Sequence, residues 1–471
     1  METSSSYLDA NLNDKRLTNR FNIIVPQLEN ELSSTIPEAS GNRGVMKGTY
    51  RFFRNRKVQP DALITAHLEQ LNFSDNTQVL PRYLCLSDSC ELDYTGKKGA
   101  DKLGPLSYLN QRGMILHNSM IIKDNGTPVG LFKQDYIIRK DEDFGKSRER
   151  ERLPIEQKES VKWLNHFNAA QLVCIQQCIE MVYIADREAD IMDIYYARWH
   201  QNMHYLIRSQ HNRSLEGTKL KLYDLLAKQE ILGTYDFKVV DHKTGKERMA
   251  TISIRYCQAP LKLASKSKNK KYLGVNNVNA IEAIELNPAK ETENPIRWVL
   301  LTSLPVENFL DAEQIVQYYL LRWLIERFFF LLKSGGAHVE KLQLEKPHQL
   351  KNAIATYSIA AMNVMKIRYT AQNQPNTTIT DAGITIEACE VLYQYAHQKI
   401  DSRILFDKEH PPNMKEFCIV LGRLGGFMPS KRQPLPGLKI LSRAYKKFSI
   451  LLEAHDVYLF QRTNEKDVGY Q

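Results

Sequence analysis

The chain has 471 residues, 43% of them hydrophobic and 9% aromatic, which is enough apolar material for roughly two to four globular domains. Its formal net charge of +10 favours a polyanionic partner, with an anionic membrane surface as the competing interpretation. The polar, acidic start predicts no signal peptide, and no apolar run reaches the about 18 uncharged residues that a membrane span needs. Seven cysteines, an odd number without zinc-site spacing, predict free thiols in a reducing compartment.

The segment up to about residue 78 is predicted to be helical and to carry a local basic stripe. Helices are expected across residues 17–28 and Val45–Arg54, where Phe52 and Phe53 pack inward. Six cations and no acid lie between positions 43 and 57. Four of them share one helical face, which is typical of a helix laid along phosphates, although a solvated face is the alternative. These four are Arg43, Lys47, Arg51 and Arg54.

Beyond this segment, strands alternate with helices, a pattern that predicts an α/β layer. Asp124–Gly126 is a strong hairpin signal between two strands. Helices are expected over residues 155–180 and from about Glu188 onward. Side chains placed at strand ends in such a layer gather at one edge, where functional sites tend to lie. The expected strands are 83–86, 114–122, 129–138, 181–185 and 202–208.

Residues 215–295 are strand-rich and irregular, and they are predicted to form a β-rich insertion, because the core pattern resumes at Trp298. Within the insertion, strands are expected at 236–240, 249–256 and 272–275, with a turn at 243–245 and a basic loop at 265–271.

The last part of the chain is predicted to be helical. A long helix is expected over residues 350–369, followed by a linker at 371–378. The predicted domains are therefore 1–78, 79–370 with its insertion, and 371–471.

One predicted helix, Gln317–Gly336, gathers chemically useful side chains along one side. At about 100° per residue, Tyr319, Arg322, Glu326 and Lys333 lie within about 60° of one another. The opposite side is apolar, so the helix is predicted to bury that side and to expose a phenol, two cations and a carboxylate on the other. An ordinary surface helix with an Arg322–Glu326 ion pair is the alternative.

Three carboxylates stand in corresponding places. Asp88 and Asp186 each follow a predicted strand, and Glu326 lies on the helix after the sheet. Such a triad can hold two divalent cations about 4 Å apart for phosphodiester chemistry, and Mg²⁺ suits these hard oxygen ligands. The alternatives are turn capping for Asp88, a calcium loop starting at Asp186 and a helix ion pair for Glu326. Asp190 and Asp193 are expected to cap the following helix or to face solvent.

These motifs together resemble the signature of the IS-four group of bacterial DDE transposases. The resemblance is carried by Asp186–Asp190 after an apolar strand and by the spacing of Tyr319, Arg322, Glu326 and Lys333 downstream. Shorter likenesses are Gly48–Asn55, Asp88–Tyr94, Leu206–Ser209, Trp298–Ser303 and Leu424–Phe427.

The resemblance implies an RNase H-like mixed α/β core with a β-rich insertion, an N-terminal helical DNA-binding domain and a C-terminal helical dimerisation domain. Asp88, Asp186 and Glu326 would hold two Mg²⁺ ions, for which Mn²⁺ would substitute. The remaining expected contacts are with DNA. Tyr319, Arg322 and Lys333 would grip phosphates, Trp298 would stack on a flipped base, and Arg208 and Arg213 are further candidates.

The implied activity is cut-and-paste transposition by a homodimer on paired DNA ends, with metal-dependent hydrolysis, hairpin formation and joining of 3′-hydroxyl ends to target DNA. The alternatives are a catalytically silent end-binding regulator and an RNase H-like nuclease without strand transfer. A cytoplasmic, nucleoid-associated location is expected of such a bacterial enzyme. The helix after Glu326 is more apolar than is typical of the family, so no contact beyond Lys333 is carried over. The basic C-terminal residues fit either DNA contact or a solubilising face.

Overall fold

The computed structural model describes residues 12, 14–73, 80–146, 153–196, 200–240, 247–262, 276–288 and 295–467. The chain divides into two compact units that are interleaved along the sequence. The first comprises Met1–Asn72, Ser89–Phe144 and Ile325–Gln471, and the second comprises Phe73–Asp88 and Gly145–Leu324. Within the described ranges, no helix is long and apolar enough to cross a membrane.

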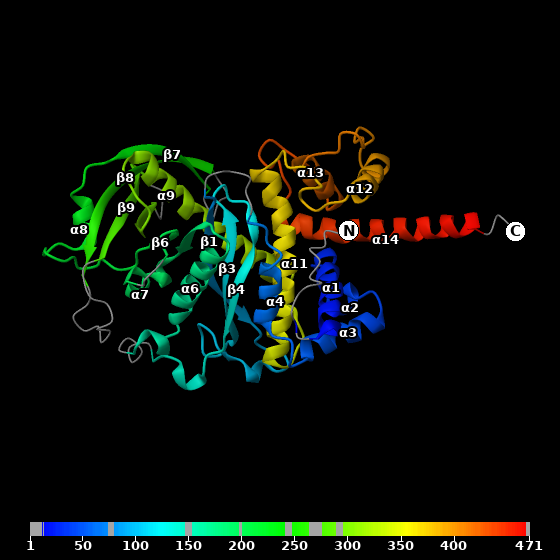
Figure 1. Ribbon diagram of the computed structural model, residues 1–471, viewed down its shortest axis with the longest axis horizontal. Helices are drawn as coiled ribbons and strands as arrows, with labels where there is room; N and C mark the ends of the chain where they lie inside the picture. Colours follow the sequence, from blue (N-terminus) through cyan, green and yellow to red (C-terminus); the bar gives the residue numbers. More distant parts are fainter. Residues whose placement is uncertain are drawn as a thin grey trace. The chain divides into compact units, whose positions relative to one another are not determined.

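A mixed sheet forms the centre of the second unit. Strand β1 (Arg82–Asp93) pairs in parallel with β5, and β5 pairs in parallel with β6. Beyond β6 the sheet continues through antiparallel pairs in the order β10, β9, β8 and β7 (Figure 1). The bounds are Glu180–Ala185 for β5, Met203–Arg208 for β6, Gly233–Val240 for β7, Glu247–Leu261 for β8, Asn276–Leu286 for β9 and Arg297–Thr302 for β10.

Strand β5, at the centre of the parallel strands, is short and apolar because both of its faces are covered. Every residue of β5 after Glu180 is buried, as is typical of strands at the centre of an α/β layer. Helix α9 (Phe309–Leu321) follows the sheet and starts at a capping box in which Asn308 and Asp311 bind each other's backbone. The other helices of this unit are α6 (Val161–Gln176), α7 (Met192–Tyr196) and α8 (Leu222–Ala227).

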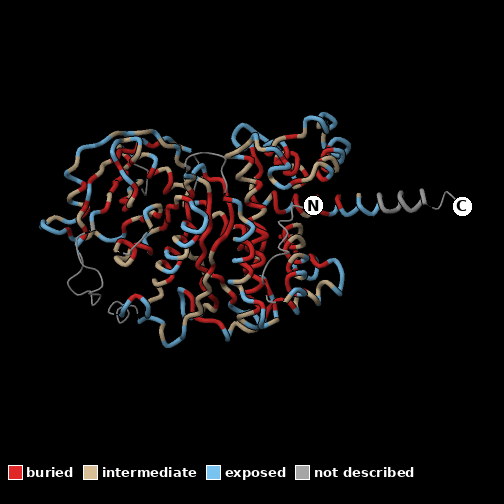
Figure 2. Tube along the Cα trace, viewed as in Figure 1, coloured by how far each residue is buried: buried red, intermediate tan, exposed pale blue. Residues whose placement is uncertain are grey.

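The first unit is organised around helix α11 (Pro347–Asn373), most of whose residues are buried (Figure 2). It contacts α1, α4, α13, α14 and strand β4. Strand β3 lies between β2 and β1 in the sheet, and β4 pairs with β3. The remaining bounds are α1 (Lys15–Asn30), α2 (Ile36–Ala39), α3 (Arg43–Arg54), α4 (Pro60–Leu68), β2 (Gly104–Pro105), β3 (Arg112–Lys123), β4 (Pro128–Ile137), α12 (Ile386–Lys399), α13 (Met414–Leu424) and α14 (Leu438–Asp467).

The predicted fold class is confirmed: a mixed α/β sheet core with flanking helices, consistent with an RNase H-like fold. The hairpin between β3 and β4 is also confirmed. Its turn is closed by a hydrogen bond from Lys123 N to Thr127 O of 2.8 Å, and Gly126 takes the left-handed conformation with φ of 87°. Glycine adopts this backbone without the steric cost that a Cβ would bring.

Several predicted strand limits are wrong. Strand β1 does not stop at Ser87 but runs on to Asp93, so Asp88 lies inside a strand rather than after one. The turn preference of a Ser-Asp-Ser sequence is local and weak, and pairing in the sheet outweighs it. Strand β9 was not predicted. The expected strand at 272–275, the turn at 243–245 and the basic loop at 265–271 lie outside the described residues.

Two predicted helix limits are wrong as well. The helix expected after Glu188 is only a 3₁₀ turn (Arg187–Ala189) followed by the short α7. The linker expected from residue 371 begins later, because α11 continues to Asn373. Burial of the apolar face of α11 against its neighbours stabilises these last turns beyond what their own polar sequence favours.

His67 of α4 should make the stability of the first unit sensitive to acid. Its Nε2 accepts a hydrogen bond of 3.2 Å from Leu131 N of β4, so the ring is neutral at that atom. Burial, followed by the charge of Lys366, lowers the pKa of His67 from 6.5 to about 3. A neutral histidine favoured by folding contributes stability above the unfolded pKa, and this stability is lost as the pH falls from about 6.5 towards 3.

We therefore expect the urea midpoint to fall less steeply between pH 7 and pH 4 in His67→Gln than in the unsubstituted protein. The control is His397→Gln, because His397 is exposed and its Nδ1 bonds a neutral carbonyl, Ile404 O, so its loss should leave the pH dependence of the urea midpoint unchanged. If the urea midpoint fell equally steeply with pH in His67→Gln and in the unsubstituted protein, His67 would not be a source of the acid sensitivity.

Candidate active site

The parallel pairing of β1 with β5 brings two acids together. The register pairs Leu86 with Ile184 and Ser87 with Ala185, so the next residue on each chain is Asp88 or Asp186. Asp186 still has an extended backbone, with φ of −85° and ψ of −173°. Neighbouring strands lie about 4.8 Å apart, and side chains at matched positions point to the same face. The two carboxylates therefore lie side by side at the end of β5.

Helix α9 supplies a hydrogen-bond donor to each of these acids. The Tyr319 hydroxyl donates to Asp186 Oδ1 at 3.1 Å, and Arg322 Nη1 donates to Asp88 Oδ2 at 3.0 Å. Residues three apart on a helix lie on one face, and the Arg322 guanidinium lies 5.8 Å from the centre of the Tyr319 ring. Tyr319 and Arg322, which the sequence placed on one stripe, therefore bind the two acids directly.

A second cation, at the end of the neighbouring strand β6, offsets the negative charge of Asp186. Arg208 ends β6, and its Nη1 lies 3.8 Å from Asp186 Oδ1. Burial, followed by the negative charge of Asp186, raises the pKa of Tyr319 to about 12. The phenol is therefore protonated near neutral pH and acts as a donor to the carboxylate. Like charges placed side by side repel, and Arg208 and Arg322 offset that repulsion.

Trp298 lies next to this group. It is the second residue of β10, and its ring centre is 5.7 Å from that of Tyr319 at an interplanar angle of 60°. The Trp298 side chain is only partly buried, unlike an ordinary core aromatic. Its indole therefore combines a packed edge on Tyr319 with surface accessible to a ligand.

The donor set fits a divalent cation. Asp88 and Asp186 offer hard carboxylate oxygens on neighbouring strands, which Mg²⁺ prefers. In this structure Arg322 and Arg208 direct positive charge at these same oxygens, as a metal ion would. Across the described residues, however, no group of three or more His, Cys, Asp or Glu side chains is close enough to hold a metal ion.

Glu326 and Lys333 belong to the first compact unit, whereas Asp88 and Asp186 belong to the second. Convergence of the three acids therefore stays a prediction. Glu326 lies in α10 (Trp323–Phe330) and is partly buried. Lys333 lies in a π-helical turn (Leu331–Gly335) that ends the same helical run. Such turns often occur at functional sites.

Lys333 is held by the end of β1. Its Nζ donates to Glu91 O at 2.8 Å and lies 3.1 Å from Glu340 Oε1. The same Glu340 oxygen accepts a hydrogen bond of 2.9 Å from Asp93 N. The Lys333 side chain keeps 35% of its surface exposed, so its ammonium is positioned and still accessible to an anion.

Asp190 has a role that the sequence analysis missed. Its side chain is fully buried and neither caps a helix nor faces solvent, which corrects that prediction. Asp190 Oδ2 accepts hydrogen bonds from Gln210 N at 2.7 Å and His211 N at 3.1 Å. Asp190 Oδ1 accepts from Tyr195 Oη at 2.7 Å and from Arg213 Nε at 3.0 Å. The carboxylate thereby ties the turn after Asp186 to the segment after Arg208.

Arg213, a further candidate for DNA contact, is mostly committed to this structural pair. Its side chain is 13% exposed, and its Nη2 also donates to Asp190 O at 2.6 Å. A cation near a motif in the sequence can thus form an ion pair with a buried carboxylate of the same motif, and DNA contact by Arg213 stays a prediction. The four-residue spacing from Asp186 to Asp190 was the feature of the sequence from which a structural role of Asp190 could have been suspected.

The basic stripe of α3 has the geometry that its sequence predicted. All four of its cations are exposed, whereas Phe52 and Phe53 are buried. The Asn42 side chain begins the helix by accepting a hydrogen bond of 2.9 Å from Val45 N. The cations Arg43, Lys47, Arg51 and Arg54 are therefore presented to solvent from an anchored helix; their contact with DNA stays a prediction.

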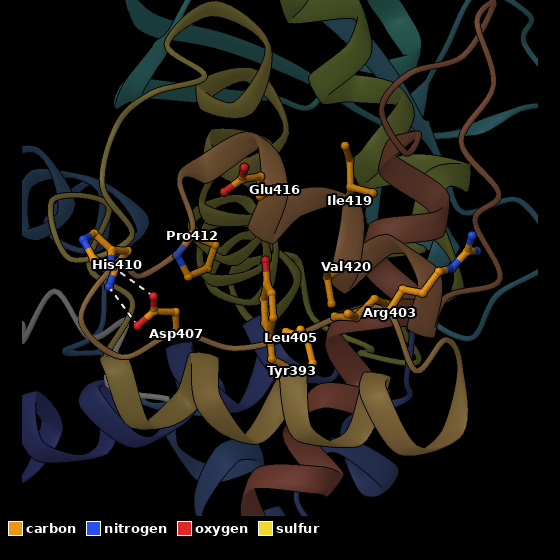
Figure 3. Close-up of a pocket in the computed structure, with 10 residues that line it drawn as sticks. Tyr393, Arg403, Leu405, Asp407, His410, Pro412, Glu416, Ile419 and Val420 are labelled. Carbon is orange, nitrogen blue, oxygen red and sulfur yellow. Dashed lines mark hydrogen bonds and ion pairs between the residues drawn. The ribbon is translucent and has the colours of Figure 1, made fainter.

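A separate hollow lies in the C-terminal helical region (Figure 3). Apolar side chains from α12, α13 and the loop between them line it, and Asp407 and His410 face each other at its edge, 3.0 Å apart. Most of the lining is apolar, and its charged groups already have partners. Arg403 pairs with Asp401 and Asp407 with His410, and Glu416 Oε2 accepts a hydrogen bond from Asn413 N. Its residues match none of the candidate site residues.

Comparison with known protein families gives one match for the region of the α3 stripe and another for a region that includes Asp186. A family model described as transposase DNA-binding matches residues 3–58, which include the α3 stripe. A model described as transposase DDE domain matches residues 175–363, which include Asp186, Tyr319 and Arg322. Two regions of the chain thus match transposase domains, one DNA-binding and one DDE, and these matches support a transposase of the DDE family.

We expect Asp190→Ala to lower the free energy of unfolding by about 3–5 kcal/mol, because it leaves the Arg213 charge buried without its carboxylate. Urea titration at neutral pH would measure the change. The matched control is Glu188→Ala in the same turn. Its carboxylate is 70% exposed and lies 3.7 Å from Lys162, so the expected loss is at most about 1 kcal/mol. Equal losses in the two variants would contradict the anchoring role.

Proposed function

We propose that this protein is a cut-and-paste DNA transposase of the IS-four group, similar to the transposase of transposon Tn-five. The observation that carries the proposal is the register of β1 and β5, which sets Asp88 beside Asp186 with Tyr319 and Arg322 bound to them. Paired carboxylates at the end of parallel strands are suited to phosphoryl transfer, and the matched DNA-binding domain supplies the substrate class.

Asp88 and Asp186, together with Glu326, would hold Mg²⁺, and Mn²⁺ would substitute. When bound, these ions activate a water or a 3′-hydroxyl and stabilise the leaving oxygen of an in-line displacement. The chain itself positions the DNA. Arg322, Arg208 and Lys333 offer guanidinium and ammonium groups to phosphates near the scissile bond, which fixes the strand in register without reading its bases.

Trp298 would receive a base extruded from the duplex end. A partly exposed indole held by Tyr319 offers a stacking face, and stacking on an aromatic ring compensates for the stacking that the base loses on leaving the duplex. The proposed reaction begins with hydrolysis that frees a 3′-hydroxyl at the transposon end. That hydroxyl attacks the opposite strand to give a hairpin, hydrolysis reopens the hairpin, and the freed hydroxyl finally attacks target DNA.

End recognition and pairing would fall to the regions outside the sheet. Residues 1–78 would bind transposon-end DNA, residues 79–370 would form the catalytic domain, and residues 371–471 would mediate dimerisation in a paired-end complex on nucleoid DNA. The rival functions are an end-binding regulator without catalysis and a nuclease without strand transfer. The paired acids with their donors favour an enzyme over the regulator, and the DNA-binding domain favours a transposase over a plain nuclease.

We expect Asp186→Asn to bind duplex DNA carrying the ends of its own element as tightly as the unsubstituted protein, but to yield no nick with Mg²⁺ or Mn²⁺. The amide keeps the shape of the side chain and removes the charge that a cation needs. A denaturing gel would resolve nicks and hairpins, and a gel shift would measure binding. Asp101→Asn, at an exposed position in the first unit, is the control and should cleave normally. Full cleavage by Asp186→Asn would refute the mechanism.

We expect Arg51→Ala and Arg54→Ala to weaken binding of end DNA and to reduce the slope of log K against log salt by about one each, as loss of one phosphate contact does. Fluorescence anisotropy over a range of salt concentrations would measure both effects. Lys408→Ala removes an equally exposed cation outside the stripe and should leave the slope unchanged. If all three variants behaved alike, the stripe would be a solvated face.

A further inference from the structure

The two acids of the site are held by one short piece of helix. Tyr319 and Arg322 are three residues apart at the end of α9, and each donates to one carboxylate. The Arg322 side chain is 11% exposed and that of Asp88 is 22% exposed, so their ion pair is largely removed from water. Charge-assisted hydrogen bonds in such surroundings are stronger than those between neutral groups.

Arg322 binds a carboxylate oxygen of Asp88 that could otherwise coordinate a metal ion. Its Nη1 binds Asp88 Oδ2 at 3.0 Å, and a divalent cation coordinated by Asp88 would use the same carboxylate. Two cations held by one carboxylate repel each other, whichever of its oxygens each one contacts. Binding of a metal ion to Asp88 must therefore weaken or displace the Arg322 contact.

The ion pair of Asp190 and Arg213, in the same unit, is an example of a permanent pair. Asp190 is fully buried, and Arg213 binds both its carboxylate and its backbone oxygen. Asp88 differs because its carboxylate keeps 22% of its surface open, so an ion can reach it. The Asp88–Arg322 pair therefore has the accessibility that an exchange of partners requires.

We propose that Arg322 is an exchangeable counter-ion of Asp88: it neutralises the carboxylate before metal binding and turns to a DNA phosphate once a divalent cation takes its place. This inference rests on the proposed function, because it takes Asp88 as a metal ligand and Arg322 as a phosphate contact. Its consequence is that metal binding and DNA binding favour each other, and thermodynamic linkage makes the two effects equal in size. Arg322 then acts in metal binding as a positioning residue.

The first experiment measures Mn²⁺ binding to the DNA-free protein by electron paramagnetic resonance. Arg322→Ala removes a charged hydrogen-bond partner from Asp88 and should bind Mn²⁺ about tenfold more tightly than the unsubstituted protein. Arg322→Gln keeps a donor without the charge and should show a smaller gain. Arg255→Ala is the matched control, because it removes an arginine of the same unit that pairs with Glu282, and its Mn²⁺ affinity should not change.

The second experiment measures binding of end DNA with and without Ca²⁺, which takes oxygen ligands. The unsubstituted protein should gain affinity with Ca²⁺, and Arg322→Ala should gain about tenfold less. Thermal melting of each variant would establish that it is folded, and Arg322→Gln serves in place of Arg322→Ala if the latter is not.

The outcomes separate the two proposals. If the unsubstituted protein binds no Mn²⁺, the proposed metal-dependent function fails. If it binds Mn²⁺ and both Arg322 variants bind it no more tightly than Arg255→Ala, the exchange is overturned while the function stands. A full Ca²⁺-dependent gain in DNA affinity by Arg322→Ala would also overturn it.

Discussion

The parallel register between β1 and β5 is the constraint on which the site depends. The register ends with Ser87 opposite Ala185, so Asp88 of β1 and Asp186, the first residue after β5, follow side by side, and two negative charges placed so repel each other. Hydrogen-bond donors and cations from the rest of the site offset that repulsion. Arg322 and Tyr319 reach the two acids from α9, and Arg208 approaches from the end of β6. The backbone geometry thus concentrates negative charge at one place, and the cationic side chains around it offset that charge.

Support for the site comes from a buried carboxylate one turn away. Asp190 binds backbone amides that follow β6 as well as the Arg213 side chain, so the ends of β5 and β6 are joined by more than their strand pairing. Desolvated charge is costly unless every oxygen is satisfied, and Asp190 is satisfied by several donors. The turn that carries Asp186 is therefore fixed by an acid that performs no chemistry itself.

The two kinds of acid in the Asp186–Asp190 motif illustrate how burial divides structural from chemical roles. Asp186 remains partly accessible, with the Arg208 guanidinium 3.8 Å from its carboxylate, whereas the Asp190 side chain is fully buried. The α3 stripe follows the same principle on the first unit. Its aromatic residues anchor the helix, and its cations stay in solvent, where they are accessible to a polyanion.

The sequence by itself determined much of the fold, because apolar periodicity and turn chemistry are local. It predicted the β3–β4 hairpin, strands β5 and β6, and the burial of Phe52 and Phe53 beneath the cations of α3. From their motifs it also predicted a triad of Asp88, Asp186 and Glu326 and a helical stripe of Tyr319, Arg322, Glu326 and Lys333. Of these, Tyr319 binds Asp186 and Arg322 binds Asp88, whereas convergence of all three acids stays a prediction. Only the tertiary structure decided how these residues pair, since strand register and side-chain contacts join residues about a hundred positions apart or more. It alone also showed that β1 runs through Asp88 and that Asp190 is a buried anchor.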